Sequence, residues 1–230
     1  MTTGLLGLSS DPEARVALEA FLPHLSAALT DTAEPDRVLV NLERFLSNVP
    51  DRTGQLWYFA HHPRAIEILA TLFAGSQFLT EILLRHPTYF ERLMEQPHLA
   101  EVRDAEALAA EIQRFLAGAG TFAGQLDVLR RFQRWELLRT GVCDLLGLLD
   151  LPTVTLALSH LADSLVRAAL DLAFAQANLS PRGFAVLALG KLGGQELNYS
   201  SDIDLLFLAE SDATVYLRPA ERIIRVLSQS

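Results

Sequence analysis

Apolar residues recur every three or four positions through most of the chain up to residue 178, which is the spacing of helices with one buried face. Prolines, capping residues and short polar breaks divide this region into separate helices. We expect helices over residues 11–29, 34–46, 62–75, 76–85, 104–115, 125–146 and 152–177. Because the breaks are short, neighbouring helices are predicted to run antiparallel in a bundle.

The pattern changes after residue 178. The loop-forming run 178–183 leads into an unbroken apolar stretch at 184–189, which is too short for a helix and predicts a buried strand. A second apolar stretch at 203–208 predicts another strand, and residues 219–227 predict a last helix. The expected fold class is α+β and mostly α. The expected domains are a helical domain at 1–180 and the start of an α/β domain at 181–230.

The composition of the chain excludes several classes of protein. Half of the 230 residues are hydrophobic and a fifth are charged, so one or two packed domains are expected. No apolar run is as long as a membrane-spanning helix, and the N-terminus lacks the basic start of a signal peptide. The single cysteine, Cys143, excludes a disulfide framework and a Cys-rich zinc site. We therefore expect a cytoplasmic protein with no membrane partner.

The net charge of −9 argues against a nucleic-acid-binding protein, because neutralising phosphates needs Lys and Arg on one face. The best local basic cluster is Arg130, Arg131, Arg134 and Arg139. At helical spacing this cluster predicts a solvated or ion-paired helix face. No nucleic-acid partner is expected.

The run Gly190–Leu205 carries the candidate chemistry, since it joins the two expected strands through a Gly-Gly turn and a short polar segment. Gly193 and Gly194 would let the backbone approach a nucleotide phosphate, with amide groups pointing at it. The alternative is an ordinary turn between a strand and a helix. Taken alone, a Gly-Gly pair favours that alternative.

Asp202 and Asp204 are two residues apart on the second expected strand, so both side chains should emerge on the same face. Two such carboxylates repel each other unless a cation lies between them, and hard oxygen ligands of this kind suit Mg²⁺ together with substrate phosphates. The alternative is an edge strand with solvated acids. Because Ile203, Leu205 and Phe207 alternate with the two acids as core residues, the metal-binding hypothesis is favoured.

Polar neighbours are candidates for supporting roles. Lys191 suits a contact with a phosphate, and Ser200 and Ser201 suit hydrogen bonds to phosphate oxygens. A solvent-exposed lysine and two capping serines explain the same residues equally well. Glu196 and Asn198 are expected to hold the shape of the loop.

The run Gly190–Leu205 resembles the nucleotidyltransferase signature of the glutamine synthetase adenylyltransferases, bifunctional enzymes that attach AMP to glutamine synthetase and remove it. The helical segments 72–87 and 129–139 also resemble that family, so the likeness covers most of the chain. The resemblance implies that Asp202 and Asp204 bind Mg²⁺ as catalytic carboxylates and that Gly193 and Gly194 lie beside the nucleotide phosphates. It further implies glutamine synthetase as the protein substrate, ATP or ADP and phosphate as small partners, and a PII-type signalling protein as a candidate regulator.

Family enzymes carry two nucleotidyltransferase units, and residues 193–198 resemble the N-terminal copy. That copy removes AMP by phosphorolysis and releases ADP, whereas the C-terminal copy attaches AMP from ATP. The family's third active-site carboxylate lies on a later strand, upstream of a Leu-Arg-Leu-Arg-Pro stretch. Here Leu217–Pro219 is preceded by Thr214–Tyr216 with no acid, and only 26 residues follow Asp204. We therefore expect the second domain to be truncated. An inactive fragment and a helical interaction module remain alternatives to an active deadenylylating unit.

Overall fold

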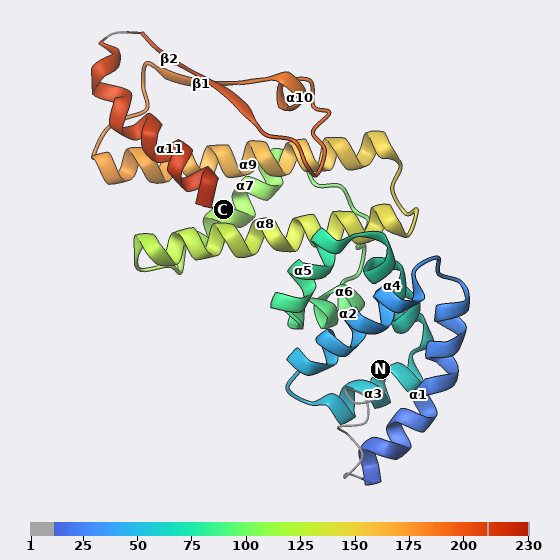
Figure 1. Cartoon of the computed structure of the whole chain (residues 1–230). Helices are drawn as coiled ribbons and strands as arrows, with labels where there is room; N and C mark the ends of the chain where they lie inside the picture. The colour runs from blue at the N-terminus through green and yellow to red at the C-terminus, as the bar shows by residue number, and fades with distance from the viewer. Residues whose placement is uncertain (1–11, 211, 230) are drawn as a thin grey trace. The chain divides into compact units, whose positions relative to one another are not determined.

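The computed structural model describes residues 12–210 and 212–229 (Figure 1). Contacts between residues divide the chain into two compact units. The first comprises the chain up to Leu99 together with Gly141–Leu148, and the second comprises Ala100–Thr140 and Leu149–Ser230. Within the described residues, no helix is long and apolar enough to cross a membrane.

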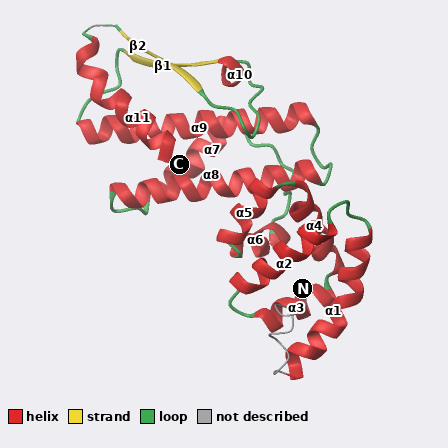
Figure 2. Cartoon of the chain, viewed as in Figure 1, coloured by secondary structure: helices red, strands yellow, loops and turns green. Residues whose placement is uncertain are grey.

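The first unit is helical throughout its described elements (Figure 2). Its helices are α1 (Pro12–Thr30), α2 (Pro35–Asn48), α3 (Arg52–His61), α4 (Pro63–Gly75), α5 (Gln77–Arg85) and α6 (Thr88–Glu95). Aromatic rings fill its core: the ring centroids of Phe21 and Phe59 lie 5.5 Å apart, and Phe90 lies 5.7 Å from Phe45. Each of these rings is at most 1% exposed, so burial of large apolar side chains holds the unit together.

Helix starts in this unit follow local signals. Pro35 and Pro63 occupy the first positions of α2 and α4, where a missing N–H costs nothing. Ser76 caps α5 by accepting a hydrogen bond from the Leu79 amide, as its place after Gly75 predicts. The predicted first residue of α1, residue 11, lies outside the described residues.

Two helices of the first unit, α3 and α6, were not predicted from the sequence. Each buries only two residues, so neither presents a long apolar stripe. Asp51 nevertheless caps α3 by accepting from the Gly54 amide. Helices this short are marginal in isolation, and here packing around Phe59 and Phe90 stabilises them.

The second unit combines helices with one small sheet, so the expected α+β, mostly α class is confirmed (Figure 2). Its helices are α7 (Ala105–Ala117), α8 (Phe122–Leu145), α9 (Leu151–Ala177), the short α10 (Gly190–Gly193) and α11 (Leu217–Gln229). The last turn of α8, from Gly141, belongs to the first unit. A 3-10 turn, η2 (Ala213–Tyr216), precedes α11. The strands are β1 (Phe184–Leu189) and β2 (Asp204–Ala209), close to the two predicted stretches.

The strands pair antiparallel as a two-stranded sheet, with Phe184 opposite Ala209 and Leu189 opposite Asp204. One face packs on the helices, because Phe184 and Phe207 join the core formed by α7, α8, α9 and α11. The other face is solvent-exposed, with Leu187 at 45% and Leu206 at 44% exposure. The prediction that β1 is buried is therefore wrong for this face: a continuous apolar run implies burial on both sides, and the described chain supplies a cover for one.

The predicted boundary at residues 180 and 181 coincides with the change from helix to strand after α9. The compact units divide the chain elsewhere, since the hairpin and α11 share a core with α7, α8 and α9. A domain division at residue 180 stays a prediction.

The basic cluster on α8 does not form one solvated face. Arg130 forms an exposed ion pair with Asp127, but Arg139 is only 4% exposed and binds Glu136 inside the second unit. Arg103 also forms an ion pair with Glu136. The ion-paired interpretation is thus confirmed for Arg130 and Arg139, whereas the solvated one is wrong for Arg139, because tertiary partners bury it.

Candidate functional site

The carboxylate pair lies at one end of the hairpin. Asp204 is the first residue of β2, and Asp202 lies two residues before it, outside the strand. Both side chains are exposed, whereas Ile203 and Leu205 between and beyond them pack against residues of α9. The alternation of exposed and packed side chains in β2 therefore extends back to Asp202, before the strand begins. The two acids lie on the same face, as a spacing of two residues requires in an extended chain.

Gly190 brings the backbone directly beside Asp204. Gly190 has a φ of +57°, and a Cβ built on it would lie 3.0 Å from Asp204 Oδ2. Any other residue would be strained by that dihedral and crowded by the carboxylate. Gly190 was not among the predicted site residues, although a glycine directly after a buried strand is a signal for a close approach of this kind.

Gly193 has a packing role that the sequence does not reveal. A Cβ at Gly193 would lie 2.6 Å from the backbone oxygen of Ala188, so the residue lets α10 fold back onto β1. Gly194 differs, since its φ is −86° and its nearest neighbour would be the Glu196 Cγ at 3.4 Å. The contact of either glycine with a nucleotide phosphate stays a prediction.

We expect Gly193→Ala to destabilise the second unit by about 1–3 kcal/mol, because the added methyl group meets backbone that cannot rotate away. Gly194→Ala is the matched control, since its methyl group has ordinary contact distances and no unusual dihedral. Urea unfolding of the full chain, followed by circular dichroism, measures both. Equal midpoints for the two variants would refute the packing role of Gly193.

Backbone amides after α10 are engaged within the loop. The amides of Gly194, Gln195 and Glu196 donate to the carbonyl oxygens of Gly190, Leu192 and Lys191, respectively. These amides therefore close the short helix in this structure. Lys191 is exposed on α10, and its contact with a phosphate stays a prediction.

Asn198 organises the segment that leads to Asp202. Its side-chain oxygen accepts hydrogen bonds from the Ser200 amide at 3.1 Å and from the Ser201 hydroxyl at 2.6 Å. Ser200 Oγ lies 3.3 Å from the same oxygen. Both serines thus act within the turn, as the capping alternative predicted, and their bonding to a phosphate stays a prediction.

The loop is anchored to α9. The Leu197 amide donates to Ser159 Oγ at 3.1 Å, and Leu192 and Leu197 join a core with Val154 and Leu158. Ser159 is fully buried and lies 38 residues from its partner. No local sequence signal could have identified Ser159 as a support for this loop, because the contact exists only in the folded chain.

The two acids face open space. Both line a groove of about 700 Å³, together with the apolar residues Leu189, Ile203, Leu205, Phe207, Ile224 and Leu227 and with Ser228. Asp202 also borders a second cavity of about 260 Å³ with Asn198, Tyr199 and Gln133. A surface with paired carboxylates beside a concave apolar wall suits a cation and a phosphate-bearing ligand with an apolar part.

Other acids lie away from the pair. Glu210 follows the far end of β2, about 20 Å along the strand from Asp204. Asp212 caps η2 by accepting from the Thr214 amide, and Glu221 is exposed on α11. Over residues 12–210 and 212–229, no three His, Cys, Asp or Glu side chains gather as a metal site. No third acid therefore accompanies Asp202 and Asp204 among the described residues, and the roles that the resemblance implies for these two stay predictions.

The model of the family described as glutamate-ammonia ligase adenylyltransferase matches residues 66–230. Three similar curated proteins are all called bifunctional glutamine synthetase adenylyltransferase/adenylyl-removing enzyme. The one from Neisseria meningitidis serogroup A is 34% identical over 223 residues, covering 94% of this chain and 25% of the relative. Those from Thioalkalivibrio sulfidiphilus and Idiomarina loihiensis are 29% and 30% identical, covering 93% and 96% of this chain. The chain thus spans about a quarter of the length of these relatives. On the extent of these matches, the chain belongs to the glutamate-ammonia ligase adenylyltransferase family.

Proposed function

We propose that this chain carries the metal- and phosphate-binding part of a nucleotidyl-transfer site that removes AMP from glutamine synthetase. The observation that carries the proposal is the placement of Asp202 and Asp204 on one exposed face, beside Gly190 and on one groove. The family relatives are named for both attachment and removal of the adenylyl group. The likeness of residues 193–198 to the N-terminal unit of the family favours removal.

The two carboxylates fit a magnesium ion. They are exposed, lie on the same face and border a groove rather than a closed core, so water and phosphate oxygens can complete an octahedral shell. Asp202 and Asp204 would hold the ion. A bound Mg²⁺ would neutralise the negative charge that develops on the phosphoryl group during transfer.

The chain's own residues then orient the reactants. Asn198 fixes the turn that presents Asp202, and Gly190 lets the chain pass close to Asp204 without a clashing side chain. The apolar wall of the groove, which includes Phe207, suits the base or ribose of the adenylyl group. An oxygen of inorganic phosphate forms a bond to the adenylyl phosphorus while the bond to glutamine synthetase breaks. The products are ADP and unmodified glutamine synthetase.

A second candidate function is binding of glutamine synthetase without catalysis. It is favoured by the absence of a third acid beside Asp202 and Asp204 among the described residues. In that case the helices and the hairpin act as an interaction module. Both candidate functions require binding to glutamine synthetase, but only the first releases ADP from it.

The test is to incubate the chain with adenylylated glutamine synthetase, Mg²⁺ and phosphate and to measure ADP. We expect release that requires both phosphate and Mg²⁺ and stops with a chelator. No ADP at any protein concentration, with retained binding to glutamine synthetase, would support the second candidate instead. Neither turnover nor binding would refute both.

Regulation and location belong to the same proposal. We infer a cytoplasmic protein with ATP or ADP as nucleotide partner and a PII-type signalling protein as a regulator. Adding such a protein to the ADP-release assay tests the regulatory part: an unchanged rate and no binding would contradict it.

A further inference from the structure

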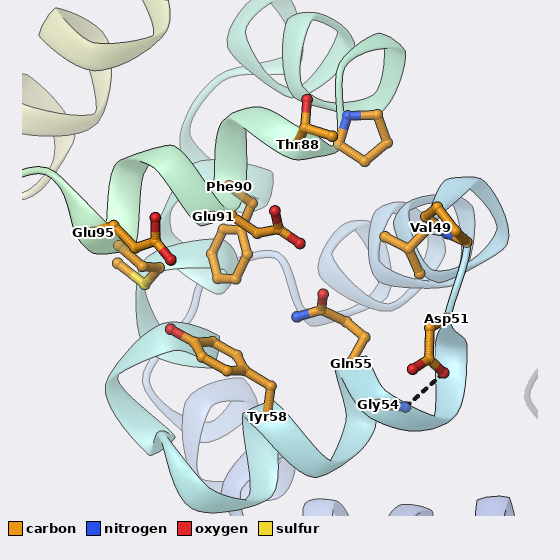
Figure 3. Close-up of a pocket in the computed structure, with 12 residues that line it drawn as sticks. Val49, Asp51, Gly54, Gln55, Tyr58, Thr88, Phe90, Glu91 and Glu95 are labelled. Carbon is orange, nitrogen blue, oxygen red and sulfur yellow. Dashed lines mark hydrogen bonds between the residues drawn. The ribbon is translucent and has the colours of Figure 1, made fainter.

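A cavity of about 370 Å³ opens in the first unit between α3 and α6, the two helices that the sequence did not predict (Figure 3). Helix α3 contributes Gly54, Gln55 and Tyr58 to its wall. Helix α6 contributes Thr88, Phe90, Glu91, Met94 and Glu95. Val49, Pro50, Asp51 and Pro87 complete the lining. This cavity is independent of the acidic pair on the hairpin, which belongs to the second unit.

Part of the cavity wall is apolar and continuous with the aromatic core. Phe90 is 1% exposed and sits in the aromatic core, with its ring at 5.8 Å from that of Phe59. Tyr58 contacts Phe90 edge to face at 6.2 Å, so its ring forms part of the same wall. Pro87, Val49 and Met94 extend this apolar lining. A preformed concave surface with an aromatic base is typical of a ligand site.

Four of the polar side chains that line the cavity extend from α3 and α6, two from each helix. Glu91 and Glu95 project from α6 toward Gln55 and Tyr58 on α3 (Figure 3). Within the described residues, none of these four side chains makes a hydrogen bond or ion pair, whereas Asp51 is occupied as the cap of α3. The groups are therefore available to a ligand.

The lining carries one sign of charge. Asp51, Glu91 and Glu95 are its charged members, and no Lys, Arg or His is among the described residues that line it. Burial, together with the negative charges of Glu95 and then Glu91, raises the pKa of Tyr58 above its ordinary value, so the phenol stays neutral. A cavity with acidic walls attracts cations and repels anions.

We propose that this cavity binds a guanidinium or ammonium group on an aliphatic stem. The stem would lie against Phe90 and Met94, and the charged head would lie between the carboxylates of Glu91 and Glu95. The face of the Tyr58 ring offers a further attraction, since cations bind over aromatic rings. The cavity is also larger than a bare metal ion needs, and its apolar base supplies no metal ligands.

Such a group has two sources, an arginine or lysine side chain of a partner protein and a free small cation. The probes are therefore a short blocked peptide with one arginine and agmatine, which carries the same head on a short chain. Putrescine tests the ammonium head, and hexanoate is the anionic control. Binding to the full chain is measured by isothermal titration calorimetry at low and at high salt, since screening weakens exposed charge pairs.

We expect the cationic probes to bind and hexanoate not to bind. The double variant Glu91→Gln with Glu95→Gln should weaken cation binding by about tenfold or more, because it removes charge-assisted hydrogen bonds. The matched control is Glu43→Gln, an exposed acid on α2 that does not line the cavity. Circular dichroism should show both variants folded, since removal of two like charges four residues apart on α6 relieves repulsion.

The relative affinities of the probes distinguish the two sources of the cation, and two other results would overturn the proposal. Tighter binding of the peptide than of agmatine supports a partner protein's side chain, and the reverse order supports a free small cation. Absence of binding by every cationic probe would overturn the proposal. So would equal binding by the double variant and the Glu43→Gln control.

Discussion

Replacing Asp202 or Asp204 by asparagine should reduce phosphate-dependent ADP release by about a thousandfold or more. A bound metal contributes several kcal/mol of charge stabilisation, and each 1.4 kcal/mol is a factor of ten in rate. Both residues are exposed, and neither contributes to the core, so stability should change little. Single-turnover assays with adenylylated glutamine synthetase measure the rate.

Glu210→Gln is the matched control for these two variants. Glu210 is an exposed acid that follows the same strand with the same alternation, but it lies at the far end of the hairpin. Its substitution should leave ADP release unchanged. If Asp204→Asn and Glu210→Gln had the same rate as the unmodified chain, Asp204 could not be a metal ligand in the reaction.

The largest loss of stability is expected for Glu136→Ala in the second unit. Glu136 is 2% exposed, and its carboxylate binds Arg139 at 3.1 Å and also Arg103. Burial works to lower the pKa of Arg103, but the hydrogen bonds and charges of Glu136 and Glu111 outweigh it and hold that pKa above its ordinary value. Replacing Glu136 by alanine therefore removes the carboxylate that Arg139 and Arg103 share. Leaving a buried charge without its partner costs about 3–5 kcal/mol.

Thermal and urea unfolding of the full chain measure this effect. Glu221→Ala is the control, since Glu221 is an exposed acid on α11 and its loss should change stability by at most about 0.5 kcal/mol. Glu136→Gln keeps the shape and a hydrogen-bonding oxygen, so we expect a smaller loss than for alanine. Equal stabilities of Glu136→Ala and Glu221→Ala would contradict this prediction. They would show that solvent replaces the interactions of Glu136 with Arg139 and Arg103.

Helices with a long apolar stripe or a clear cap were predictable. The predicted stretch 76–85 became α5 with Ser76 as its cap, and the stretch 152–177 became α9. Helices α3 and α6 were not predicted, because each buries only two residues. Two apolar positions are too few to produce the helical periodicity by which a helix is recognised in a sequence. Their stability comes from aromatic contacts with residues far along the chain, such as Phe45 with Phe90.

The same limit applies to the candidate site. Spacing alone predicted that Asp202 and Asp204 share a face, because alternation along an extended chain is a local property. It did not predict the closeness of Gly190 to Asp204, which depends on the register of the hairpin. Nor did it predict that Gly193 serves the approach of α10 to β1, since that role is defined by the Ala188 oxygen.

By itself, the sequence determined the cap of α5 at Ser76, the two strands, the shared face of Asp202 and Asp204 and the family to which the chain belongs. These properties depend on residues that are close in the sequence, or on a motif that can be recognised from consecutive residues alone. Only the tertiary structure decided which polar groups are engaged and which are available. Ser159 holds the loop at Leu197, and Glu136 pairs with the buried Arg139. Glu91 and Glu95 line a cavity and make no hydrogen bond or ion pair with any other residue that the structure describes. The reason is physical: burial and pairing of a polar group are set by residues distant in the chain, and those distances exist only after folding.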